Sequence, residues 1–199
     1  TAPARAAAPA AAATVGGKVA PAAPKLVVLL VADQFRADNL TRLGPILDAG
    51  GLRRLLQRGA TAIGHYGQQN TYTGPGHALI ATGSYGYLNG ITQNKFWNQR
   101  SGRSESMLYD DSVKILGNKK QSADDDNSPR NFIGSTVFDE LRLLRPESKV
   151  VAVALKGRGA ILLGGHLGQA YFFSDQGEMT SSTFYMNQLP AWVQKWNSE

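Results

Sequence analysis

The stretch Leu26-Val-Val-Leu-Leu-Val-Ala32 (LVVLLVA) is continuously apolar, rich in branched side chains and followed directly by Asp33. Seven residues are too few for a buried helix, and the pattern predicts a central strand covered on both faces. Lys149–Leu155 (KVVAVAL) has the same character, and Gln169–Phe173 predicts a third strand. These three runs indicate a buried, mostly parallel sheet.

Segments with helical spacing lie between the predicted strands. Apolar residues within Leu40–Arg58, interrupted by Gly-Pro and Gly-Gly, predict two short helices that end at Gly59. Ser135–Leu144 predicts an amphipathic helix with a Ser or Thr cap, and Leu189–Trp196 predicts another helix. Alternating strands and helices predict an α/β fold, with helices on both faces of a mostly parallel sheet.

The segments between these elements are less regular. Thr61–Tyr66 predicts a short strand, and Thr71–Gly90 predicts a loop followed by a short helix from about Pro75 or Gly76. Residues 101–130 are polar and predict a long loop with one hairpin.

Residues 1–24 differ from the rest, because 12 of them are Ala, 4 are Pro and none is acidic. Such a segment buries too little surface to offset its ordering entropy, which predicts a disordered tail. It is typical of what remains after a signal peptide is removed, and the alternative is an ordinary cytoplasmic leader. We therefore expect a periplasmic or secreted protein. Residues 25–199 would be the N-terminal part of a larger folded domain, and an inserted cap would begin near residues 174–199.

The composition narrows the class of protein. A chain of 199 residues with 42% hydrophobic residues is one domain or a large piece of one. The absence of cysteine excludes disulfides, Cys-ligated zinc and a cysteine nucleophile. The net charge of +6 favours anionic partners, but the basic residues are spread along the chain, which argues against nucleic acid. No apolar run approaches the ~20 residues that span a bilayer.

Polar residues follow two of the predicted strands at their carboxyl ends, where parallel sheets bind ligands. Asp33 follows the first strand, as a metal ligand or as a cap for the next helix. Lys156 and Arg158 follow the second, two residues apart, so they point the same way in an extended segment. They would grip an anion between them or form a solvated basic turn.

The segment from Thr71 to His77 (TYTGPGH) combines hydroxyls, two glycines and a proline at the start of a helix. Glycines let backbone N–H groups approach a ligand, and a helix start favours an anion. The alternative is a capped helix start without chemistry.

The ordered combination of motifs resembles the alkaline phosphatase superfamily, and more narrowly its PafA/PhoK type, which is close to the nucleotide pyrophosphatase/phosphodiesterases. The motifs, which extend over residues 25–173, are VADQFR at Val31–Arg36, TGPGHA at Thr73–Ala78, TGS at Thr82–Ser84, GI at Gly90–Ile91, NKFW at Asn94–Trp97 and LKGRGAIL at Leu155–Leu162.

The resemblance implies an alkaline-phosphatase-like fold and a phosphomonoesterase with two Zn²⁺ ions. Asp33 would be a zinc ligand, and Thr73 would be the metal-bound nucleophile that is transiently phosphorylated. Asn94 would hold a phosphoryl oxygen with help from the Gly74 N–H. Lys156 and Arg158 would also contact the phosphoryl group, a mark of monoesterases rather than diesterases.

The chain departs from the family pattern at Asn89, where His is frequent, and at Gly157, where an acidic residue is common. It also lacks the two further aspartates and three histidines that complete the family's metal site. His77 matches a position that is not a ligand, and His65 and His166 are better explained as structural. We therefore expect the N-terminal portion of a longer phosphatase, inactive by itself.

Other possibilities remain open. Phosphodiesterase or nucleotide pyrophosphatase activity and a non-catalytic anion-binding fragment are the alternatives to monoester hydrolysis. The cluster Asp124–Asn127 would be a solvated loop or a Ca²⁺ site. We expect small-molecule phosphate monoesters as substrates, no nucleic-acid or membrane partner, and a monomer.

Overall fold

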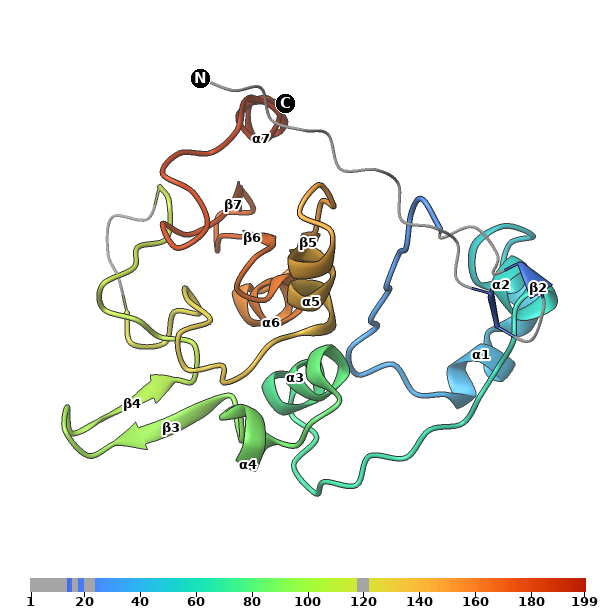
Figure 1. Ribbon diagram of the computed structural model, residues 1–199, viewed down its shortest axis with the longest axis horizontal. Helices are drawn as coiled ribbons and strands as arrows, with labels where there is room; N and C mark the ends of the chain where they lie inside the picture. Colours follow the sequence, from blue (N-terminus) through green and yellow to red (C-terminus); the bar gives the residue numbers. More distant parts are fainter. Residues whose placement is uncertain (1–13, 16–17, 20–23, 118–121) are drawn as a thin grey trace. The chain divides into compact units, whose positions relative to one another are not determined.

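The computed structural model describes residues 14–15, 18–19, 24–117 and 122–199 (Figure 1). The chain divides into two compact units, residues 1–60 and residues 61–199. Most of the predicted tail lies outside the described residues. Its described part contains two short strands, β1 (Thr14–Val15) and β2 (Lys18–Val19), which pair antiparallel.

The first unit contains short helices where the sequence predicts them. These are α1 (Asp38–Arg42), the 3₁₀ helix η1 (Gly44–Ile46) and α2 (Gly51–Arg58). Gly59 is the C-cap of α2, as predicted. None of the three helices contains a buried residue.

The strand predicted for Leu26–Ala32 is not formed. The run pairs with no described strand, and Leu26 and Leu30 are 79% and 75% exposed. A buried strand needs partners at both edges and cover on both faces, and the described residues of the first unit offer neither. The strand predicted for Thr61–Tyr66 is also absent, and Ile63 is 89% exposed.

The second unit contains the predicted strand–helix–strand arrangement. Strand β5 (Val151–Ala154) pairs in parallel with β6 (Gln169–Phe173), and α6 (Gly157–Gly164) connects them. Strand β7 (Met179–Thr180) pairs antiparallel with the other edge of β6. Helix α6 packs on β5 and β6. It begins at Gly157, two residues beyond Leu155, which follows the carboxyl end of β5 at Ala154.

The other elements of this unit precede and follow the sheet. They are α3 (Thr73–Thr82), α4 (Gly86–Asn89), β3 (Lys95–Asn98), β4 (Arg103–Ser106), α5 (Val137–Leu144) and α7 (Ala191–Ser198). Helix α3 begins two residues before the predicted start. Strands β3 and β4 pair as an antiparallel hairpin, which begins before residues 101–130, where the sequence predicts one. In the part of the chain with described coordinates, no helix is long and apolar enough to cross a membrane.

The main core lies where α3 packs against α6. Small residues allow this approach, since Ala78 and Ala160 are fully buried and a Cβ on Gly159 would lie 3.7 Å from Nε2 of His77 in α3. The larger side chains of the core include Ile91, Phe132, Ile161, Leu162 and Phe172.

A buried carboxylate joins α5 to the end of α6. Asp139 accepts hydrogen bonds from the backbone and hydroxyl of Thr136, which caps α5, and from the backbone N–H groups of His166 and Leu167. Burial disfavours its charge, but these hydrogen bonds, with that of the His166 ring, outweigh the effect and hold the pKa of Asp139 below its ordinary value. The capping predicted for Ser135–Leu144 is therefore confirmed, with Thr136 as the cap.

We predict that Asp139→Asn lowers the free energy of unfolding by on the order of 2 kcal/mol at neutral pH, because an amide cannot accept all of these hydrogen bonds. The pKa of Asp139 is lower in the folded protein than in the unfolded chain. Ionised Asp139 therefore stabilises the fold in full at pH values above the unfolded pKa. This stabilisation is lost as the pH falls through the lower native pKa. Denaturant unfolding of the intact protein at several pH values measures both effects.

Glu140→Gln, in the same turn but exposed, is the matched control and should change stability by no more than about 0.5 kcal/mol. A difference between wild type and Asp139→Asn that stays constant down to pH 2 would contradict the assignment.

Candidate active site

Thr73 is the first residue of α3, directly after an extended Tyr72. The next residue, Gly74, is buried, and its backbone N–H donates to Oδ1 of Asn94 at 2.7 Å. A Cβ at Gly74 would lie 3.0 Å from that oxygen and 3.1 Å from the carbonyl oxygen of Gln93. The structure therefore brings the predicted nucleophile next to two predicted phosphate-binding groups.

This hydrogen bond fixes the orientation of the Asn94 amide. A backbone N–H only donates, so the atom that faces Gly74 is the carbonyl oxygen and the other is the NH₂ group. Among the described residues, no acceptor binds the Asn94 Nδ2 group, which remains available as a donor. The Gly74 N–H thus acts on Asn94 in this state rather than on a ligand directly.

Lys156 and Arg158 lie at the start of α6. Lys156 is the extended N-cap residue and is exposed, and Arg158 lies in the first turn with its side chain 16% exposed. No carboxylate in the described ranges forms an ion pair with Lys156. A helix N-terminus carries a positive partial charge, so both cations reinforce an anion-binding potential that already exists there.

The first turns of α3 and α6 approach each other through His77. Its Nδ1 lies 2.8 Å from the Thr73 carbonyl oxygen, and its Nε2 would lie 3.7 Å from a Cβ on Gly159. Because a carbonyl only accepts, Nδ1 carries the hydrogen. His77 therefore has a structural contact on the α3 side.

Asp126 binds Arg158, and sequence reasoning missed it. Its Oδ2 accepts from Nε of Arg158 at 2.9 Å and from the backbone N–H of Arg158 at 3.2 Å. Its Oδ1 accepts from the Ser106 hydroxyl at 2.5 Å. The only sequence signal was its place in the acidic run 124–126, for which a solvated loop or a Ca²⁺ site were the alternatives.

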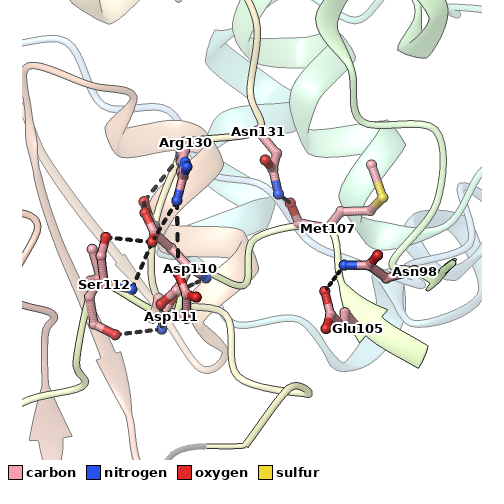
Figure 2. A network of polar contacts seen from close by, with 11 residues as sticks. Asn98, Glu105, Met107, Asp110, Asp111, Ser112, Arg130 and Asn131 are labelled. Atoms are coloured by element: carbon pink, nitrogen blue, oxygen red, sulfur yellow. Dashed lines mark hydrogen bonds and ion pairs between the residues drawn. The ribbon is translucent and has the colours of Figure 1, made fainter. Parts of the chain in front are cut away.

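The loop that carries Asp126 is ordered by buried polar contacts. Asn127 is fully buried, donates to the carbonyl oxygens of Asp110 and Val113, and accepts from the Asp110 N–H. Figure 2 shows further contacts: Ser112 and Arg130 bind Asp110, Asn131 binds Met107, and Asn98 binds Glu105. The solvated loop expected at Asp124–Asn127 is therefore wrong for Asp126 and Asn127, because other segments of the second unit bury both.

The open end of the β3–β4 hairpin connects the two halves of this site. Asn94 immediately precedes β3, Ser106 ends β4, and the N–H of Met107 donates to the Asn94 carbonyl oxygen. At the turn end, hydrogen bonds from Asn98, Ser101 and Arg103 lower the pKa of Glu105 to about 2. The hairpin is thus held at both ends.

Asp33 lies in the first unit, at an exposed turn before Gln34, whose φ of 55° is left-handed. Within the described ranges, no group of three or more His, Cys, Asp or Glu side chains is arranged to hold a metal ion. In the second unit, the Thr73 hydroxyl is the one predicted zinc ligand, and its described residues alone do not fit a two-zinc site.

Two other residues singled out from the sequence, His166 and Asn89, have structural partners. His166 Nδ1 lies 3.3 Å from Asp139. Asn89 is buried, where it donates to Ser84 and accepts from the Ile91 N–H. These contacts explain His166 and Asn89 as parts of the scaffold around α3 and α6.

Comparison with known proteins decides the family. Residues 27–190 match the family of type I phosphodiesterases and nucleotide pyrophosphatases. The chain belongs to this family. Among its relatives, alkaline phosphatase PhoV of Synechococcus elongatus is 42% identical over 182 residues, which are 89% of this chain and 33% of PhoV. Alkaline phosphatase PafA of Elizabethkingia meningoseptica is 38% identical, over 88% of this chain and 33% of PafA.

The crystal structure of wild-type PafA superimposes with a TM-score of 0.76 at 36% identity, over 83% of this chain and 32% of that one. This likeness confirms the predicted alkaline-phosphatase-like α/β fold. The chain spans about a third of the length of these relatives.

We predict that Gly157→Ala destabilises the protein by about 1–3 kcal/mol, as overpacking does. A Cβ there would lie 2.6 Å from the carbonyl oxygen of Asp126 and 2.9 Å from its Cβ, so α6 or the loop must move. Thermal or denaturant unfolding of the intact protein measures the loss.

Gly76→Ala is the matched control. Gly76 lies inside α3 with nothing within 4 Å of a Cβ, so the substitution should be neutral or stabilise by up to about 1 kcal/mol. Equal stability of the Gly157→Ala variant and the wild type would mean that the contact with Asp126 is not tight.

Proposed function

We propose that the intact protein is an alkaline phosphatase that hydrolyses phosphate monoesters, with Thr73 as nucleophile and a phosphothreonine intermediate. The observation that carries the proposal is the hydrogen bond from the Gly74 N–H to Oδ1 of Asn94, which holds the Asn94 side chain beside the start of α3, next in sequence to Thr73. The similarity to PhoV and PafA over most of this chain supports the same reaction class.

The reaction has two displacements. The Thr73 oxygen forms a bond to phosphorus while the ester oxygen leaves and is protonated to an alcohol. Water then attacks the phosphothreonine, which returns the Thr73 hydroxyl and releases inorganic phosphate. Because threonine is a poor nucleophile, its hydroxyl proton has to be removed in the first step.

The groups at the starts of α3 and α6 would stabilise the charge on the transferring phosphoryl group. Asn94 would donate through Nδ2, Arg158 would offer its planar fork, and Lys156 would add a point charge. Donors that are already oriented need no reorganisation during the reaction, which is the largest contribution to catalysis in many enzymes.

Asp33 and Thr73 would be zinc ligands, and the remaining ligands of a two-zinc site would come from residues outside this chain. A bound zinc pair would lower the pKa of a coordinated hydroxyl and stabilise the entering and leaving oxygens.

Small-molecule phosphate monoesters are the substrates that we expect, because Lys156 and Arg158 together would bind a dianionic phosphoryl group. Phosphodiesterase or nucleotide pyrophosphatase activity is the alternative within the family, and this chain alone would act at most as an anion-binding fragment. Periplasmic or secreted localisation and a monomeric state are part of the proposal.

We predict that a zinc chelator abolishes turnover of p-nitrophenyl phosphate by the intact protein at alkaline pH, and that added Zn²⁺ restores it. Residues 1–199 alone should show no turnover with or without Zn²⁺, because the ligand set is incomplete. Turnover that a chelator does not affect would refute the zinc mechanism. Turnover by residues 1–199 would refute the claim that ligands come from outside them.

We predict that Lys156→Ala and Arg158→Ala each reduce kcat/KM for p-nitrophenyl phosphate by about 10- to 1,000-fold, the range for loss of one charge-stabilising group. The same variants should lose much less activity toward bis-p-nitrophenyl phosphate, since a diester has one charge fewer on its phosphoryl oxygens. Lys195→Ala, a change in an exposed ion pair of α7, is the control and should leave both rates unchanged. Variants that keep most of their kcat/KM would favour the phosphodiesterase alternative, which tolerates the loss of Lys156 and Arg158.

A further inference from the structure

The pair formed by Asp126 and Arg158 is unusual for a phosphate-binding site. The Asp126 side chain is 8% exposed, and it lies 2.9 Å from the guanidinium that would meet the substrate. A carboxylate at this distance lowers the positive potential that an incoming anion experiences. Attraction of substrate therefore does not explain its presence.

The geometry of the pair points to orientation instead. Asp126 binds Arg158 through Nε and through the backbone N–H, both with the same oxygen, Oδ2. No acceptor among the described residues binds the two terminal nitrogens of Arg158. The carboxylate thus holds the guanidinium by its inner edge and leaves the outer edge free, which is the edge that binds two phosphoryl oxygens at once.

Asp126 is itself fixed from two sides. The Ser106 hydroxyl donates to Oδ1, and the same oxygen of Ser106 accepts from the Leu108 N–H. On the other side, Gly157 lies against the Asp126 backbone. An arginine held by a carboxylate whose second oxygen and backbone are also fixed keeps few of its rotamers, so little entropy is lost when phosphate binds.

Ser106, which binds Asp126, also links the part of the site at Asn94 to the part at Arg158. Ser106 ends β4, and Asn94 immediately precedes the paired strand β3, with Lys95 opposite Ser106 in the register. The hairpin that places Asn94 beside Gly74 therefore also places the hydroxyl that fixes Asp126. One hairpin therefore carries Asn94 at one end and, through Ser106 and Asp126, contacts the group that binds Arg158.

We propose that Asp126 is the positioning residue for Arg158, an inference that rests on the proposed phosphatase function. Asp126 would not contact the substrate. It would hold the guanidinium through Nε, so that the two terminal nitrogens of Arg158 face the phosphoryl group. Its removal should lower the rate of phosphoryl transfer more than it lowers the affinity for phosphate, because the change that frees the arginine also removes a repulsive charge.

The test is a double-mutant cycle in the intact protein with p-nitrophenyl phosphate at alkaline pH. Asp126→Ala should reduce kcat by about 10- to 100-fold, since a misplacement of about 1 Å can cost ~100-fold. The inhibition constant of inorganic phosphate should change by less than about 3-fold. In the Arg158→Ala background, the same Asp126 change should reduce kcat by less than about 3-fold, because there is no guanidinium left to hold.

The matched control is Asp124→Asn, in the same acidic run but exposed and paired with Lys95, which should leave kcat within about 2-fold. Asp126→Asn is the second variant, because it keeps the volume of the buried side chain. It should show the same dependence on Arg158, which keeps the test valid if Asp126→Ala fails to fold.

An equal loss of kcat in both backgrounds would overturn the inference, because a merely structural role of Asp126 would act whether or not Arg158 is present. An Arg158→Ala variant with wild-type kcat/KM would overturn the proposed phosphate grip itself. The two failures are therefore distinguishable from each other.

Discussion

The site depends on the close approach of α6 to the loop that precedes α5. At Gly157 the helix lies against the Asp126 backbone with no space for a side chain, and one residue later Arg158 turns back to bind the Asp126 carboxylate. Steric contact and ion pair therefore act on adjacent residues of one helical turn. A small displacement of the loop would alter the direction of Arg158, and with it the anion site at the start of α6.

Local sequence predicted the elements whose formation depends on nearby residues. The cap of α5 at Thr136 and the end of α2 at Gly59 appear at or near their predicted positions. Hydrogen bonds and backbone preferences within a few residues decide such features. Gly74 and Asn94, which the resemblance to alkaline phosphatases assigns to one phosphoryl group, also lie together. That expectation depended on the resemblance, because composition and spacing carry no information on contacts between distant residues.

Features that depend on distant segments could not be predicted in this way. Leu26–Ala32 has the composition of a buried strand, but a strand is defined by its hydrogen-bonded neighbours, and the run has none among the described residues. Asp126 presents the opposite case. Its acidic surroundings indicate solvent, whereas its burial comes from Ser106, twenty residues earlier, and Arg158, thirty-two residues later. Pattern alone gives no sign of either partner.

The Asp139 junction has a consequence for how the protein opens transiently. One carboxylate accepts from the amides of Thr136, His166 and Leu167, which lie at the start of α5 and just after α6. If the carboxylate leaves its place, all of these amides lose their acceptor together. Their deuterium uptake should therefore follow one shared opening event, so that the start of α5 and the turn after α6 form a single cooperative unit although 27 residues separate Asp139 from His166.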